Sequence, residues 1–215
     1  MGNTDKVILD ELKKDLNRKF GLSDIYDEGS TSGRVLYFDI GYGEKFVLFT
    51  LPIDKDFDLS LLKYSMPLEV LKESVRRFIE IKAPTGYRIR FLISFDKEDR
   101  YNPVISHISK IGKDKILILV NLEETGLGNE KIVINGLDYM SLLKIDKILD
   151  ENKFRIGKIF RKDGISLAYK TDIKVLEFVS FPNEFKDVLK REFFDKKRVD
   201  FIVMFIFTFL KKVFR

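Results

Sequence analysis

Residues 87–121 read YRIRFLISF, then DKEDRYNP, then VISHISKIG, then KDKILILVN. The first segment alternates apolar and other residues from Ile89 to Phe95, which is the period of a β-strand. The third begins after Asn102-Pro103, a common helix start, and carries apolar residues at helical spacing. The fourth is a short aliphatic run, typical of a strand buried on both faces. The stretch therefore predicts a strand, a helix and a second strand in a right-handed βαβ crossover.

In open sheets built from such units, ligands bind beyond the carboxyl ends of the strands. This rule draws attention to the loops 96–103 and 121–128, and both carry acidic side chains at their beginnings. Carboxylates gathered there could hold magnesium, whereas a charged, solvated crossover loop explains the same residues. The acidic side chains are Asp96, Glu98, Asp99, Glu123 and Glu124, with Lys97 and Arg100 beside them.

Before this stretch, residues 4–20 have the apolar stripe of an amphipathic helix. Two strands are predicted over 33–40 and 45–51, and the link Gly41-Tyr-Gly-Glu44 is typical of a hairpin turn. A further helix is predicted from Pro67 onward. We therefore expect an α/β core over residues 1–130, a mixed sheet with flanking helices in the order αβββαβαβ.

Residues 131–181 predict a β-rich continuation of the same domain or a small second domain, with short strands over 154–160, 165–169 and 174–181. The pattern of residues 182–215 predicts a C-terminal helix with basic flanks. The expected fold is therefore the α/β core followed by an α+β extension that ends in this long apolar helix. Its run VDFIVMFIFTFL, residues 199–210, is shorter than the roughly 20 apolar residues of a membrane span. A core or dimer helix, a helix lying at a membrane surface and a marginal span remain alternatives. The residues expected to make membrane or partner contact are Phe201, Met204, Phe205 and Phe207.

The composition restricts the chemistry of any active site. The 215 residues include no cysteine and one histidine, and the net charge is +5. Disulfides and cysteine nucleophiles are excluded, and zinc sites normally need several His or Cys ligands. We therefore expect no cofactor, with magnesium only if the protein is a nuclease. No signal-peptide pattern is present at the start, which favours a cytoplasmic protein, with association at a membrane surface as an alternative.

The order of elements to residue 121 resembles the core of the PD-(D/E)XK, or restriction-endonuclease-like, superfamily. The resemblance implies a magnesium-dependent nuclease with an acid-x-Lys triplet on the third strand. Phe49-Thr50-Leu51 stands where that triplet is expected. The resemblance therefore implies a relative of the nucleases that binds or scaffolds without the standard active site.

Three functions are compatible with these features. The first is a nucleic-acid-associated protein, because lysine and arginine side chains bind phosphates. The second is an assembly or membrane-surface protein that acts through residues 183–214, as a homo-oligomer or with a protein partner. The third is a nucleotide-sensing α/β domain. The residues predicted to contact DNA or RNA are Arg76, Arg77, Lys97, Arg100, Lys113 and Lys115.

Overall fold

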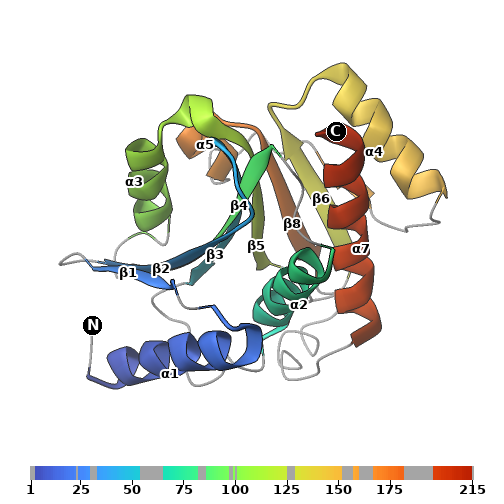
Figure 1. Cartoon of the computed structure of the whole chain (residues 1–215). Coiled ribbons are helices and arrows are strands. Elements are labelled where there is room, and N and C mark those ends of the chain that lie inside the picture. Colours follow the sequence, from blue (N-terminus) through green and yellow to red (C-terminus); the bar gives the residue numbers. More distant parts are fainter. Residues whose placement is uncertain are drawn as a thin grey trace.

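The computed structural model shows a central β-sheet with helices on both faces (Figure 1). It describes residues 3–22, 24–29, 33–53, 65–81, 86–96, 99, 101–124, 129–151, 157–159, 167–181 and 196–214. The predicted α/β class is confirmed, and the elements follow the predicted order αβββαβαβ as far as residue 124.

The described strands are β1 (Tyr26–Gly29), β2 (Gly33–Ile40), β3 (Lys45–Ile53), β4 (Tyr87–Asp96), β5 (Ile116–Glu124), β6 (Asn129–Asn135), β7 (Gly157–Ile159) and β8 (Val175–Phe181). The described helices are α1 (Asn3–Phe20), α2 (Met66–Glu80), α3 (Asn102–Ile111), the 3-10 turn η2 (Lys113–Lys115), α4 (Tyr139–Glu151), α5 (Leu167–Thr171) and α7 (Lys196–Val213).

The strand order in the sheet is β1-β2-β4-β3-β5-β8-β6-β7. Strands β4, β3, β5 and β8 are parallel neighbours, whereas β2 is antiparallel to β4 and β6 is antiparallel to β8. The predicted crossover from β4 through α3 to β5 is present, but β3 lies between its two strands. All four parallel strands therefore end at one edge of the sheet, the carboxyl edge, at the bottom of the sheet in Figure 1.

The predicted hairpin between β2 and β3 is wrong. Strand β4 lies between them, antiparallel to β2 and parallel to β3. The link at Gly41–Glu44 therefore crosses the start of β4. A Cβ on Gly43 would come within 2.7 Å of the Cα of Tyr87, so the glycine is needed for this close crossing and not for a two-stranded turn.

Two layers of helices cover the sheet. Helices α1, α2, α4 and α7 pack on one face and form the larger core. Phe49, Phe78 and Phe91 lie at its centre, with ring centroids 4.9 to 6.2 Å apart. Helix α3 and the short α5 cover the other face through residues such as Val104 and Leu167.

Part of the segment predicted as a strand over 165–169 forms α5 instead, from Leu167 on, and residues 165 and 166 lie outside the described residues. Two hydrogen bonds hold this single turn and its neighbours. Glu177 on β8 accepts the backbone N–H of Leu167 at 2.9 Å, and the Thr171 hydroxyl donates to the Leu167 carbonyl at 2.7 Å. The hydrogen bond to Glu177 joins α5 to β8, and the local apolar pattern that predicted a strand does not reveal such a contact.

The long apolar helix predicted over 183–214 is not found among the described residues, and 183–195 lie outside them. Helix α7 covers 196–213, and its polar side chains such as Lys197 and Lys211 are exposed, so it is amphipathic. Phe205 lies fully buried in the core, and the Phe207 ring lies 4.2 Å from that of Phe78. Phe201 is partly buried, and Met204 is exposed. Among the described helices, none has the length and apolar character that crossing a membrane requires.

Candidate functional site

Five buried polar side chains lie in the carboxyl-terminal halves of β3, β4 and β5 and at the neighbouring position of β8. They are Thr50 on β3, Ser94 and Asp96 on β4, Asn121 on β5 and Glu177 on β8, and each is at most 5% exposed. We call these five residues the polar row. Buried polar groups are costly unless they are hydrogen-bonded, so a set of them on four neighbouring strands indicates a special role.

The polar row lies on the face of the sheet that α3 and α5 cover. Leu48, Leu92, Leu119 and Val175 belong to the core on that face, and each stands two positions before a member of the row. Side chains alternate between faces along a strand, so both sets point the same way. The register agrees, because Thr50 pairs with Asn121, and Asn121 with Glu177. On each of the four strands, a buried polar side chain thus follows a buried apolar one on this face.

Hydrogen bonds fix several members of the row. The Thr50 hydroxyl donates to Asn121 Oδ1 at 3.3 Å, and Glu177 accepts the backbone N–H of Leu167. Asp96 Oδ1 accepts the N–H of Asp99 at 3.2 Å. The buried Ser94 hydroxyl makes no hydrogen bond within the part of the chain that the structure describes. The row is therefore held in place but keeps hydrogen-bonding capacity.

Asp99 connects the row to the surface. Its carboxylate accepts the N–H of Tyr101 at 3.0 Å and forms an ion pair with Lys170 on α5. The Lys170 ammonium also lies 5.0 Å from the centroid of the Tyr101 ring. The side chains of Asp99 and Lys170 are about one third exposed, at 35% and 30%. A ligand approaching from the solvent would meet this pair next to Asp96.

The carboxyl-edge rule placed part of this site correctly from sequence. It led to Asp96 and Asp99, which the structure brings together. Lys97, Glu98 and Arg100 lie outside the described residues, as do the side chains of Glu123 and Glu124. Sequence reasoning missed Thr50, Ser94, Asn121 and Glu177. A polar residue two positions after a buried aliphatic one within a strand was the signal that would have found them.

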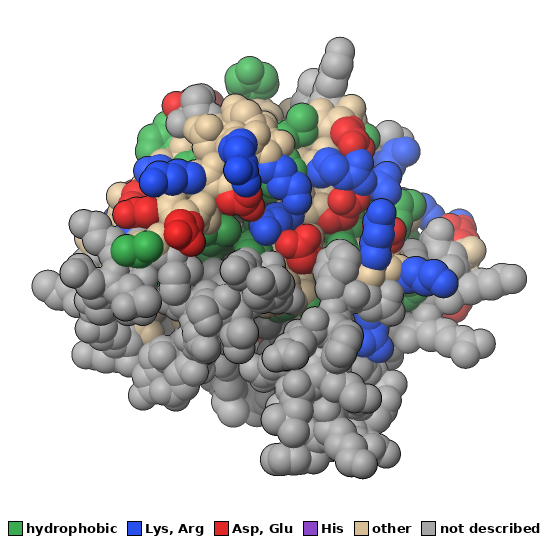
Figure 2. Space-filling view, turned by 90° about the horizontal axis from the view of Figure 1, so that it is seen from below, with side chains coloured by type: hydrophobic (Ala, Val, Ile, Leu, Met, Phe, Trp, Pro, Cys, Tyr) green, Lys and Arg blue, Asp and Glu red, His purple; other side chains and the backbone are tan. Residues whose placement is uncertain are grey.

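The residues predicted to bind nucleic acid do not form one surface. Arg76 and Arg77 on α2 form ion pairs with Glu73, and Arg76 also pairs with Glu80. The hydrogen bond from Arg76 lowers the pKa of Glu73. Lys113 and Lys115 lie in η2, at the opposite edge of the sheet from the polar row. On the described part of the face in Figure 2, basic and acidic side chains interleave and form no patch of one sign.

The only histidine of the sequence lies away from the polar row. His107 on α3 is buried, and its Nε2 lies 3.0 Å from Arg90 Nη1. Burial lowers its pKa to about 4, and the nearby Arg90 adds to the effect. Arg90 is near the start of β4 and Asp96 ends it, about 20 Å away at the ordinary rise of a strand. His107 is thus unsuited to serve a metal at the carboxyl edge.

The donor set at the carboxyl edge does not fit a zinc centre of the usual kind. Catalytic zinc sites use histidine ligands with carboxylates or cysteines, and the chain supplies neither a second histidine nor a cysteine. Among the described side chains, no group of three His, Asp or Glu residues could hold a metal ion. Asp96 and Glu177 offer oxygen donors, which suit harder cations than zinc.

Several solved structures share this fold. LapA from Legionella pneumophila, an aminopeptidase, superposes with a TM-score of 0.67 at 12% identity, over 99% of this chain and 67% of that one. Glutaminyl cyclase from Macrostomum lignano superposes with a TM-score of 0.63 at 9% identity, over 98% of this chain and 84% of the cyclase. Cytosol aminopeptidase from Coxiella burnetii superposes with a TM-score of 0.57 at 12% identity, over 95% of this chain and 64% of the aminopeptidase. The chain spans about two thirds of the length of the Legionella proteins that it matches. No protein-family model and no curated protein matches it.

These neighbours correct two predictions. The core has the fold of aminopeptidases and glutaminyl cyclase, so the resemblance to the PD-(D/E)XK nucleases is wrong. The prediction that the protein is nucleic-acid-associated, nuclease-like and DNA-binding is therefore also wrong. The order of elements along the chain suggested a nuclease, but the insertion of β4 between β2 and β3 builds a different sheet.

Proposed function

We propose that this chain is a peptidase-type protein that binds the amino terminus of a peptide at the carboxyl edge of its sheet. The polar row carries the proposal, because it gathers buried carboxylate, amide and hydroxyl groups on one face of four neighbouring parallel strands. Ligands of open α/β sheets bind at this edge. The fold supports the proposal as well, since its solved neighbours include aminopeptidases, which by definition act at the amino end of a peptide.

The chemistry of the edge suits a peptide amino terminus. An α-ammonium group is a cation with three N–H donors, and carboxylates such as Asp96 and Asp99 accept charge-assisted hydrogen bonds from it. The Ser94 hydroxyl and the Thr50–Asn121 pair can donate to or accept from the first peptide unit. Lys170, held by Asp99, can attract a side-chain or backbone carbonyl oxygen of the same peptide.

Binding, and not metal-assisted hydrolysis, is the activity that these residues support. The donor set does not fit a histidine-ligated zinc pair, so no hydrolytic step is assigned to such a metal. The two-metal sites of aminopeptidases use the ions to activate water and hold the leaving group. In this chain, the residues at the edge would orient the amino terminus and exclude water from it.

A binding experiment tests the proposal. Fluorescence anisotropy would compare short labelled peptides with a free amino terminus against the same peptides with an acetylated one. We expect binding only of the free form. Asp96→Asn should weaken it roughly 10- to 100-fold, because hydrogen bonds to charged groups contribute about 1.5–3 kcal/mol. Glu177→Gln should weaken it less, because the amide oxygen still accepts the N–H of Leu167.

The matched control is Asp150→Asn, which removes a carboxylate exposed on α4. It should leave peptide affinity unchanged, and thermal melts should show that all variants are folded. Equal binding of free and acetylated peptides would overturn the proposal, as would equal effects of Asp96→Asn and Asp150→Asn. Release of a fluorophore from aminoacyl-coumarin substrates, with and without added Mn²⁺ or Zn²⁺, would show whether the protein also cleaves what it binds.

Two further predictions accompany this proposal. The first is a cytoplasmic location: on fractionation of cells that produce the full chain, we expect the protein in the cytoplasmic fraction. An oligomer or protein partner that uses 183–214 can be checked by sedimentation of the full chain at several concentrations.

A further inference from the structure

A cavity opens at the amino edge of the sheet, opposite the polar row. Its volume is about 810 Å³, within the range of small-molecule sites. Lys45 at the start of β3, Lys113 in η2 and Lys174 just before β8 contribute to its lining. Three segments far apart in the sequence thus bring one basic side chain each to the same hollow.

These three lysines differ from most other basic groups near them. Lys110 is paired with Glu28, Lys170 with Asp99 and Lys212 with Glu151. Within the described residues, Lys45, Lys113 and Lys174 form no ion pair and no hydrogen bond through their side chains. The lining thus carries three ammonium groups against two carboxylates. The pKa of the nearby Asp138 is lowered by hydrogen bonds from Ser141, and the positive charge of Lys174 also helps to lower it.

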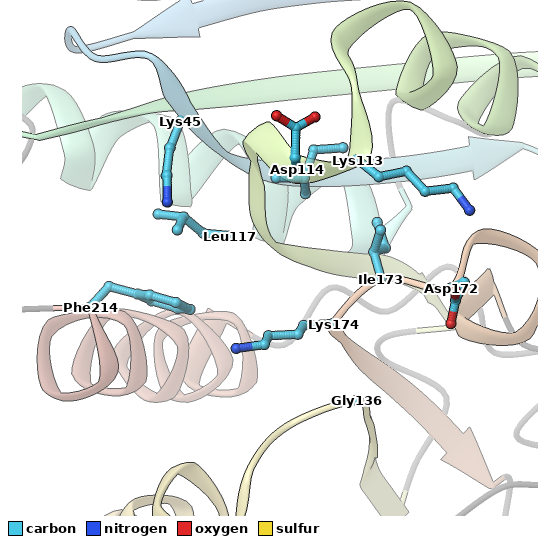
Figure 3. A pocket seen from close by; sticks show the side chains of 10 residues that line it. Lys45, Lys113, Asp114, Leu117, Gly136, Asp172, Ile173, Lys174 and Phe214 are labelled. Carbon is cyan, nitrogen blue, oxygen red and sulfur yellow. The ribbon is translucent and has the colours of Figure 1, made fainter.

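Two carboxylates also line the cavity, Asp114 and Asp172. Neither forms an ion pair with the three lysines in the described structure. Figure 3 shows Lys45 and Lys174 directed into the space beside the end of α7, whereas Lys113 extends toward Asp172 on the far side. Lys45 and Lys174 are thus the pair placed to hold one anionic group.

The walls next to these two lysines are apolar. Leu117 at the start of β5, Ile173 before β8 and Phe214 after α7 line the cavity and are partly exposed. In Figure 3 the Leu117 side chain lies beside the Lys45 ammonium, and Phe214 lies on the same side as Lys174. Apolar surface beside a basic pair suits a ligand that has an apolar body and an anionic head.

We infer that this cavity binds a small organic anion, with a carboxylate or phosphate head held by Lys45 and Lys174 and an apolar body against Phe214 and Leu117. The site is independent of the proposed peptide site, because it lies at the other edge of the sheet and shares no residue with the polar row. Its affinity is modest, because each exposed lysine contributes little in water.

The inference can be tested with 3-phenylpropionate as the probe, titrated into the isotope-labelled full chain and followed by two-dimensional amide NMR. The neutral 3-phenylpropionamide has the same apolar body without the charge, and inorganic phosphate has the charge without the body. We expect saturable shifts with 3-phenylpropionate at residues around Lys45, Leu117 and Lys174. The amide should bind at least several-fold more weakly.

Lys45→Gln and Lys174→Gln should each weaken binding about 2- to 5-fold, which is the size expected for one exposed charge pair. Lys14→Gln, which removes an exposed lysine from α1, should have no effect. The inference is overturned if the neutral amide binds as well as the acid, if the three variants behave alike or if the shifts map to the polar row. It is also overturned if phosphate alone binds as tightly as 3-phenylpropionate, because the apolar wall would then contribute nothing.

Discussion

Two polar clusters lie on the same face of the sheet, and they are built on different principles. The first, which we call the arginine network, surrounds Arg90 near the start of β4. Its guanidinium donates two hydrogen bonds of 2.7 Å to Asp39 and lies 4.6 Å from the centroid of the Tyr37 ring. The second is the polar row at the other end of the strands, where carboxylates accept backbone N–H groups.

The arginine network contains charges of both signs in contact with one another. Glu28 accepts hydrogen bonds from Lys110 and Tyr37, at 2.7 and 3.1 Å. The hydrogen bond from Lys110 lowers the pKa of Glu28. A network that neutralises its own charges stabilises the fold, whereas hydroxyl, amide and carboxylate groups at a strand end are suited to a ligand. Substitutions in the two clusters should therefore separate stability from binding.

The largest effect is expected for Arg90→Met. The change removes two charge-assisted hydrogen bonds to Asp39 and leaves that partly buried carboxylate with only the longer contact to Arg88, so the free energy of unfolding should fall by about 3 kcal/mol. Urea unfolding measures this change. Arg88→Met is the matched control, because Arg88 is 37% exposed and lies 3.4 Å from Asp39, and it should cost less than about 1 kcal/mol. Similar losses in both variants would mean that the network does not carry the stability we assign to it.

A pH effect of intermediate size is expected from His107. Its pKa is about 4 in the folded chain and 6.5 for an unperturbed histidine, because burial disfavours the charged ring. Protons therefore bind more tightly to the unfolded chain, and stability falls as the pH drops below 6.5 toward 4. Between pH 7.5 and pH 5 this single group should lower the free energy of unfolding by about 2 kcal/mol.

Urea unfolding of the protein and of His107→Leu at both pH values isolates this contribution from that of the carboxylates. The variant should lose about 2 kcal/mol less than the parent over the same interval. The groups that face the ring are Arg90, Glu28, Lys110 and Asp39, and they are the same in both proteins. Equal losses in the two proteins would show that His107 does not titrate as its burial requires.

The smallest stability effect is expected for Thr50→Val in the polar row. The shapes are similar, and the change removes the hydrogen bond to Asn121, so the cost should be about 1 kcal/mol. Thr208→Val is the control, because the partly exposed Thr208 donates to the carbonyl of Met204 in its own helix. Peptide affinity separates the two clusters more clearly than stability does. The affinity should fall in Thr50→Val and stay unchanged in the less stable Arg90→Met. A fall in Arg90→Met with no change in Thr50→Val would reverse the roles of the two clusters.

Local patterns along the chain were sufficient to predict most elements. The alternation in β4, the helix spacing in α3 and the aliphatic run in β5 each follow from a few neighbouring residues, and all three are confirmed. The order of the strands in the sheet was not predictable in this way, because it depends on pairing between distant segments. The Gly41–Glu44 turn chemistry favoured a hairpin that β4 interrupts.

The candidate site also has one part that the local sequence predicts and one part that depends on the pairing of distant strands. Asp96 follows β4 directly, so the carboxyl-edge rule identified it from the sequence. Glu177 lies on β8, and its place beside Asn121 depends on β8 pairing with β5. Nothing near Glu177 in the sequence indicates that neighbour. Polar residues that meet across strands become visible as a site only when the strand order is known.

The glycine-containing link at Gly41–Glu44 also bears on how the chain is made. It holds β2 and β3 one strand apart, and the strand that fills this space emerges from the ribosome only after α2. Until then both strands expose unpaired edges next to each other, at a translation rate of roughly 5–20 residues per second. Premature closure of a local hairpin would be a kinetic trap, and exposed edges favour aggregation. The centre of this sheet is therefore completed late, by a segment distant in the sequence, which predicts slow folding for a chain of its size.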